Sequence, residues 1–152
     1  MHRRGVIGAA LASIGGVVML ARAGTAQQPA VAHRLALHID QNDPAVMNMA
    51  LGNASNAAAY FAQRGETVAV ELVAYGPGLH MLRADTSPVK ARLAEVRKAV
   101  SQIVFSGCNN TLQAMQKAED KEIALVGEAR IVPAGIVRLM ELQKLGYAYI
   151  RP

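Results

Sequence analysis

The chain has 152 residues, the size of a single domain, and its 52% hydrophobic residues are enough for a buried core. Its formal charge of +5 does not indicate a nucleic-acid-binding protein. Three of the 16 basic residues (Arg3, Arg4 and Arg22) lie in an N-terminal leader, and the other 13 stand against 11 acidic residues. These 13 are scattered along the chain without interleaved aromatic side chains, so no nucleic acid is expected as a partner.

The N-terminus has the organisation of an export signal. The positively charged start, 1–4, is followed by an uncharged run, 6–20, that is too short and too rich in Gly for a comfortable membrane span. We expect 1–26 to be a cleavable signal peptide, 27–32 a flexible mature N-terminus and 33–152 the folded domain. The protein is then periplasmic, exported by the Sec or the twin-arginine (Tat) route, with no membrane attachment after cleavage. An uncleaved N-terminal anchor is the alternative.

The first half of the mature sequence alternates between strand-like and helix-like segments. An apolar strand at 34–39 precedes a helix at 45–63, for which Asp43 and Pro44 form a cap and a first helical position. The β-branched run at 67–75 is typical of a central parallel strand, and Gly76-Pro77-Gly78 breaks it.

The second half continues the alternation. In order, it predicts a helix at 88–98, a strand at 101–105, a helix at 112–118, a strand or helix end at 123–126, a strand at 130–132, a helix at 133–145 and a strand at 147–150. The helix at 133–145 carries an apolar stripe of Ile136, Val137, Leu139, Met140 and Leu142. Tyr147 and Tyr149 alternate, so we expect them to share a face that packs on a helix or a neighbouring subunit. Such alternation predicts an α/β fold with a mostly parallel sheet and helices on both faces.

Cys108, the single cysteine, is the candidate reactive residue. In an open parallel sheet ligands bind beyond the carboxyl ends of the strands, where we expect the loops 40–43, 75–79 and 107–110 to converge. Cys108 lies in the third loop at a helix N-terminus, where the helix dipole and the backbone N–H groups of 109–111 favour the thiolate. The alternative is a buried structural cysteine.

Six further residues near these loops are candidate ligand-binding residues. They are His38, Asp40, Gly76, Gly78, Asn109 and Asn110. Each has a plainer interpretation, as a core histidine, a turn cap, a loop glycine or a helix cap. The histidines show no metal-ligand spacing and the glycines no nucleotide fingerprint, so neither a metal nor a cofactor is expected.

Four segments together resemble the DsrE/DsrF-like family of sulfur-relay proteins, which includes TusBCD-type sulfurtransferase subunits, and are most similar to its exported branch. These segments are His38-Ile39-Asp40 with Asp43-Pro44, VAYGPG at 73–78, SGCNNTL at 106–112 and GYAYIRP at 146–152. The resemblance implies a three-layer, flavodoxin-like sandwich with a mostly parallel five-stranded sheet. It also implies a homo-oligomer, a trimer or a hexamer, in which Cys108 matches the sulfur-carrying cysteine.

The function implied is that of a periplasmic sulfur carrier that accepts a persulfide on Cys108 from a sulfur donor and passes it to an acceptor protein. No second catalytic residue is evident, so the protein is at most a sulfurtransferase-like carrier. The alternative is a non-catalytic small-ligand-binding or oligomeric assembly module with a structural cysteine. A thiol-disulfide oxidoreductase is not favoured, because the chain has no resolving cysteine.

Overall fold

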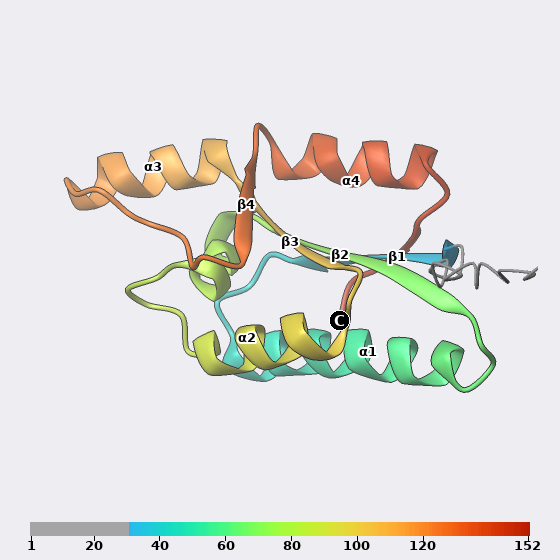
Figure 1. Cartoon of the computed structure of the whole chain (residues 1–152). Coiled ribbons are helices and arrows are strands. Elements are labelled where there is room, and N and C mark those ends of the chain that lie inside the picture. The colour runs from blue at the N-terminus through green and yellow to red at the C-terminus, as the bar shows by residue number, and fades with distance from the viewer. Residues whose placement is uncertain (1–30) are drawn as a thin grey trace, which may run out of the picture.

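The computed structural model describes residues 31–152, so the expected signal peptide and most of the expected flexible segment 27–32 lie outside the described residues. The described chain is a three-layer α/β sandwich of the flavodoxin-like kind, with one sheet between two layers of helices (Figure 1). The sheet has five strands and all its pairings are parallel, which confirms the fold class. Within 31–152 no helix is long and apolar enough to cross a membrane.

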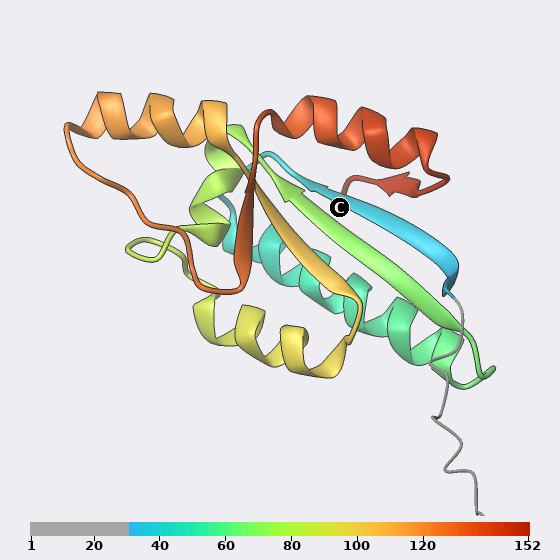
Figure 2. The ribbon, with the colours of Figure 1, turned by 45° about the horizontal axis from the view of Figure 1, so that its top comes forward.

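The strands and helices alternate along the chain as the sequence predicts. In order they are β1 (Val31–Ile39), α1 (Pro44–Ala62), β2 (Thr67–Ala74), the 3-10 helix η1 (Gly76–Leu82), α2 (Lys90–Ala99), β3 (Ile103–Cys108), α3 (Asn109–Glu119), β4 (Ala129–Val132), α4 (Gly135–Lys144) and β5 (Ala148–Ile150). The strand order β4-β3-β2-β1-β5 places β2 at the centre of the sheet (Figure 2).

Three local predictions need correction. The first strand begins at Val31, which pairs with Thr67, so the last two residues of the expected flexible segment belong to β1. The strand does break before Gly76-Pro77-Gly78, but the expected loop at 75–79 is mostly a 3-10 helix. The segment 123–126 is neither a regular strand nor a helix end, and its Leu125 forms an isolated antiparallel bridge with Arg83.

The cap of the first helix is confirmed. The side chain of Asp43 accepts a hydrogen bond from the backbone N–H of Ala45 at 2.7 Å, and Pro44 occupies the first turn, where its missing N–H costs nothing. The loop between β1 and α1 is short and lies at the carboxyl edge of the sheet, and α1 runs back along the sheet from there.

The two faces of the sheet bury different amounts of apolar surface. The face covered by α1 and α2 holds the large core, which includes Leu37, Leu72 and Phe105. On the other face α4 covers a small cluster of Ala36, Val73, Leu139 and Leu142. Helix α3 projects beyond the carboxyl ends of the strands (Figure 1), and Leu112 is its one buried residue.

The expected apolar stripe of the last helix is only half correct. Leu139 and Leu142 face the sheet and are buried, whereas Ile136, Val137 and Met140 are 49–56% exposed. The stripe in the sequence is wider than the single sheet face against which α4 packs, so apolar side chains remain on its outer surface.

Candidate functional site

The three segments expected to be loops meet at the carboxyl edge of the sheet, although 75–79 is mostly 3-10 helix and 107–110 is a direct junction between β3 and α3. The backbone N–H of Tyr75 donates to the carbonyl of Ile39 at 3.1 Å, which joins the ends of β1 and β2. The N–H of Gly76 donates to the hydroxyl oxygen of Thr111 at 3.0 Å, which joins the end of β2 to the first turn of α3. The predicted convergence is therefore confirmed.

The two candidate glycines, Gly76 and Gly78, have different roles at this edge. A Cβ on Gly78 would lie 2.3 Å from the carbonyl oxygen of Ile39, so no larger residue fits there without moving the backbone. Gly76 has φ +52°, a left-handed conformation that favours glycine. Gly78 therefore lets η1 pack against β1, and Gly76 provides the turn with which η1 begins.

Cys108 is the last residue of β3 and the N-cap of α3, with 5% of its surface exposed. Burial raises the pKa of its thiol. Hydrogen bonds from the side chain and the backbone N–H of Thr111 lower it, as do the backbone N–H groups of Gly135 and Asn110. The net pKa lies below its ordinary value, so the site favours the thiolate.

The N-termini of two helices contribute to this site. The sequence predicts that a helix N-terminus, that of α3, lies at Cys108. The second helix N-terminus is that of α4, which begins at Gly135, a residue that was not among the predicted site residues. Because β3 and β4 are parallel neighbours, the helices that follow them begin side by side at the same edge. The strand-to-helix junction at 132–135 was the signal that could have located Gly135.

Tyr75 forms a wall of the site between β2 and α4. A Cβ on Gly135 would lie 2.8 Å from Cδ1 of Tyr75, so the first turn of α4 rests directly on this ring. Burial and the carboxylate of Asp40 raise the pKa of the phenol. Tyr75 is therefore neutral at physiological pH and adds no charge beside Cys108.

His38 is buried beside Tyr75 on the same sheet face as Cys108. Its ring stacks on Tyr75 with centroids 4.6 Å apart, and its Nδ1 shares a 2.8 Å hydrogen bond with the hydroxyl of Tyr149. The other nitrogen, Nε2, is buried and has no hydrogen-bond partner among the described residues. Burial lowers the pKa of His38, Asp40 opposes that shift and Arg151 reinforces it, so the imidazole is neutral.

Asp40 pairs with the penultimate residue of the chain. Its carboxylate accepts hydrogen bonds of 2.9–3.1 Å from the guanidinium of Arg151, an ion pair that fastens the C-terminus to the end of β1. Tyr147 packs on the small cluster under α4 and Tyr149 reaches His38, so the two tyrosines face the same side of the sheet as expected.

The two asparagines after Cys108 occupy different positions. Asn110 is exposed and its backbone N–H reaches the sulfur, whereas Asn109 is half-buried at the first position of α3 and is not among the donors to Cys108. A groove of about 600 Å³ opens beside Asn110 and Thr111. Its other lining residues are Asn42, Gly76, Pro77, His80, Ala114, Met115 and Ala118.

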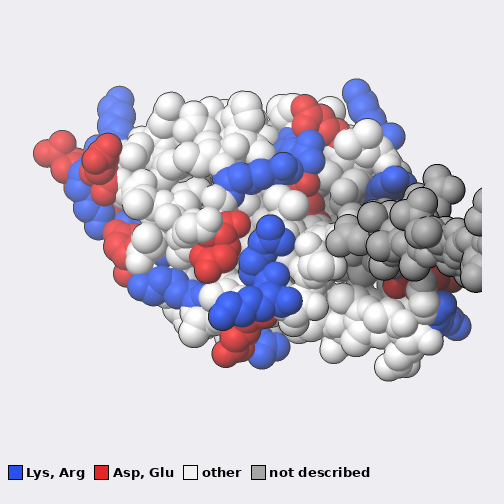
Figure 3. Space-filling view, viewed as in Figure 1, with Lys and Arg blue, Asp and Glu red and all other residues white. Residues whose placement is uncertain are grey.

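The groups around Cys108 are suited to stabilising an anion there. Within residues 31–152 no group of three or more His, Cys, Asp and Glu side chains could bind a metal ion. Figure 3 shows an uncharged stretch of surface where α3 and α4 approach each other. A negatively charged sulfur here would be stabilised by N–H groups and helix dipoles.

Comparisons with known proteins show a relative among the solved structures. No protein-family model matches the chain, and no curated protein does. Among solved structures, the chain is similar to MTH1491 from Methanobacterium thermoautotrophicum, a protein of unknown function, with 31% sequence identity and a TM-score of 0.67. The match covers 79% of this chain and 99% of the methanobacterial one. The protein therefore belongs to the same family as MTH1491.

Proposed function

We propose that the protein is a sulfur carrier that accepts a persulfide on Cys108, as its resemblance to the DsrE/DsrF-like family implies. The observation that carries the proposal is the set of hydrogen-bond donors from two helix N-termini around one cysteine sulfur. A persulfide is anionic near neutral pH, so the donors that favour the thiolate also favour the loaded form.

The loading step needs no oxidant or reductant. The Cys108 thiolate attacks the outer sulfur of a donor such as thiosulfate, a new S–S bond forms, and the bond between that sulfur and the sulfite group breaks. The products are the Cys108 persulfide and sulfite, which leaves with the bonding electron pair. Transfer to the thiolate of an acceptor protein repeats the exchange.

Access to Cys108 is supported by the groove beside Asn110 and Thr111. Cys108 is only 5% exposed, but its neighbours Asn110 and Thr111 line an open groove of about 600 Å³. A small sulfur donor, or the tail of a donor or acceptor protein, would approach by this route.

Mass spectrometry of the intact protein tests the proposal. After incubation with thiosulfate, polysulfide or a small persulfide, the native protein should gain the mass of one sulfur atom, removable by a thiol reductant. Cys108→Ser should gain none. A native Cys108 that takes up no sulfur from any donor and resists alkylation at neutral pH would contradict the carrier function.

The periplasmic location is part of the same proposal. It is supported by the sequence pattern of a charged start followed by an uncharged run at 6–20. Fractionation of the native host, with N-terminal sequencing of the purified protein, should recover a chain that begins near residue 27 in the periplasm. Recovery of the full-length chain in the cytoplasm would contradict it.

A second candidate, an oligomeric assembly module, is favoured by the outer surface of α4. Ile136, Val137 and Met140 are all about half exposed on this one helix. Apolar side chains gathered in this way are typical of a subunit interface, which fits the expected trimer or hexamer. Sedimentation should show Val137→Asp to be a smaller species than the native protein. Met49→Asp, an equally exposed position on α1, is the matched control.

A further inference from the structure

Glu71 is a buried carboxylate at the middle of the central strand. Only 2% of it is exposed, and its side chain lies on the sheet face covered by α4. It accepts hydrogen bonds from the hydroxyl of Ser106 at 2.6 Å and from a guanidinium nitrogen of Arg130 at 2.7 Å. Arg138 donates two further bonds of 2.7 Å from Nε and Nη2, one to each carboxylate oxygen. We call these four residues the Glu71 network.

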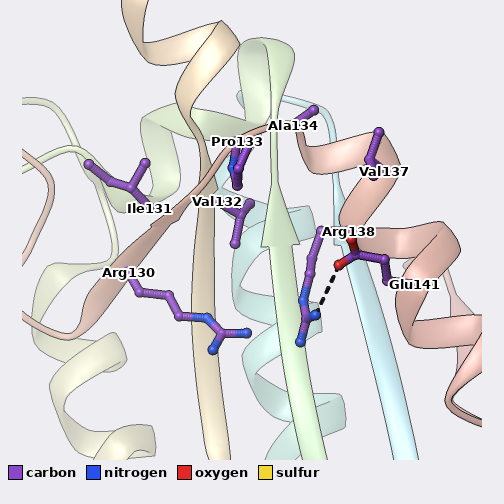
Figure 4. Close-up of a pocket in the computed structure, with 8 residues that line it drawn as sticks. All are labelled: Arg130, Ile131, Val132, Pro133, Ala134, Val137, Arg138 and Glu141. Carbon is purple, nitrogen blue, oxygen red and sulfur yellow. Dashed lines mark hydrogen bonds and ion pairs between the residues drawn. The ribbon is translucent and has the colours of Figure 1, made fainter.

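The network connects the elements that surround Cys108. Ser106 lies two residues before Cys108 on the same face of β3, and Arg130 lies on β4 and also donates from Nε to the Ser106 hydroxyl at 3.0 Å. Figure 4 shows Arg130 and Arg138 reaching in from β4 and α4 across the sheet, beside a pocket of about 330 Å³. The buried carboxylate thus joins β2, β3, β4 and α4 at one point.

Arg138 fixes the first turn of α4. Its guanidinium forms a bidentate pair with Glu71, a geometry that sets both the distance and the orientation of the helix on the sheet. Its backbone N–H donates to the carbonyl of Ala134 at 3.0 Å, so the anchored residue belongs to the turn that contains Gly135. Gly135 in turn presents its N–H to Cys108.

Apolar packing under α4 is too small to explain this precision by itself. The cluster there has four buried members, whereas the core on the opposite face has nineteen. Apolar contacts are non-directional, and a buried ion pair contributes little to stability over apolar residues of similar size. The directional bonds of Arg138 therefore define the position of α4 better than they increase the stability of the fold.

We propose that Glu71 and Arg138 are positioning residues that hold the N-terminus of α4 against Cys108. Neither side chain is among the groups that hydrogen-bond to the sulfur of Cys108, and both act through the position of Gly135. The role of this arrangement in sulfur transfer rests on the proposed sulfur-carrier function, whereas its effect on the thiol pKa of Cys108 does not. Arg130 and Arg138 are the charged groups that face Glu71, and the neutral Tyr75 is the titratable neighbour of Cys108.

The test is the ionisation of the single thiol, measured from the pH dependence of its alkylation by iodoacetamide. In Arg138→Met the N–H of Gly135 is no longer held in place, so the thiol pKa should rise. At a pH below both pKa values, a rise of one unit lowers the thiolate fraction, and with it the alkylation rate, about tenfold. Arg138→Lys, which keeps the charge but not the bidentate bonds, should show a smaller rise.

Two further variants separate positioning from folding. Arg138→Met removes one of the two arginines that pair with the buried Glu71 carboxylate, which leaves Oε2 of Glu71 without its donor. Glu71→Gln/Arg138→Met removes the carboxylate charge as well and should recover folding, by circular dichroism and urea unfolding, while the thiol pKa stays high. Arg97→Met is the matched control, because Arg97 on α2 donates to the carbonyl of Ile103 at the far end of β3. It should leave the pKa unchanged.

An unchanged thiol pKa in the folded double variant and in Arg138→Lys would overturn the proposal. Failure of the sulfur-carrier function is a different result: the native protein would take up no sulfur from thiosulfate, while the variants would still shift the ionisation of Cys108. The two measurements share one cysteine but no reagent, so each hypothesis can fail separately.

Discussion

The two faces of the sheet are made by the same strands and are built differently. Along β2, Val70 and Leu72 face α1 and α2, while Glu71 and Val73 face α4, because successive side chains of a strand point to opposite sides. The α1–α2 face is a continuous apolar core. The α4 face carries a network of hydrogen-bonded polar residues, one of which, Ser106, lies two residues before Cys108 on β3.

The comparison indicates that one face of the sheet provides stability and the other positions the groups around Cys108. Apolar burial is proportional to area and tolerates small displacements, so it suits the face that provides stability. Hydrogen bonds weaken steeply with distance and angle, so they suit the face that must place an N–H group against a sulfur. Substitutions on the α1–α2 face should change the free energy of unfolding without changing the thiol pKa of Cys108. Substitutions on the α4 face should change that pKa.

The largest effect on stability is expected for Phe105→Ala. Phe105 is fully buried in the large core, and its removal leaves a cavity that should cost about 3–5 kcal/mol in the free energy of unfolding. Urea unfolding measures this loss. The thiol pKa of the molecules that remain folded should equal that of the native protein; a clear rise would show that the two faces are not separable.

Gly135→Ala should affect both stability and the site. The new Cβ would lie 2.8 Å from Cδ1 of Tyr75, so α4 must move away from the sheet at a cost of about 1–3 kcal/mol. Its N–H then leaves Cys108, and the thiol pKa should rise in iodoacetamide titrations. Gly127→Ala, where an added Cβ meets nothing within 4 Å, is the control. Equal behaviour of the two variants would argue against a close approach of α4.

Thr111→Val should act mainly on the sulfur. The substitution preserves shape but removes the hydroxyl that donates to Cys108 and accepts from the N–H of Gly76. A thiol pKa higher by about one unit is expected, from the loss of one hydrogen bond to a charged group. Thr111→Ser keeps the hydroxyl and should behave like the native protein. A thiol pKa in Thr111→Val equal to that of the native protein would show that the Thr111 hydroxyl does not stabilise the thiolate.

The smallest effect is a pH dependence of stability that arises from His38. Burial holds its pKa below the ordinary value of 6.5, so the unfolded chain binds the proton more readily than the folded one. The stabilising contribution is therefore complete above 6.5 and is lost as the pH falls through the folded pKa. Urea unfolding between pH 7.5 and 5 should show a steeper loss for the native protein than for His38→Asn. Parallel curves would contradict a buried neutral imidazole.

Much of the fold could be predicted from the sequence because its patterns are local. Asp43-Pro44 begins α1 as expected, and the β-branched run before Tyr75 forms the central strand. The position of Cys108 at a strand-to-helix junction of the carboxyl edge is confirmed as well. Its reactivity stays a prediction, as do the ligand roles of His38, Asp40, Gly76, Gly78, Asn109 and Asn110.

The rest of the site depends on residues distant in the sequence. Tyr149 reaches His38 across 111 positions, and Arg138 reaches Glu71 across 67. Glu71 was itself visible as a charged residue inside an apolar strand, a pattern that indicates a buried partner without naming it.

The sequence by itself determined the order of strands and helices and placed one thiol at a helix N-terminus, because propensity, capping and alternation are properties of neighbouring residues. Only the tertiary structure decided what surrounds that thiol. Strand order sets β3 beside β4 and so brings the first turn of α4 to Cys108, with Glu71 and Arg138 fixing the helix in place. Contacts of this kind arise from packing and directional hydrogen bonds between segments far apart in the chain, which no local pattern records.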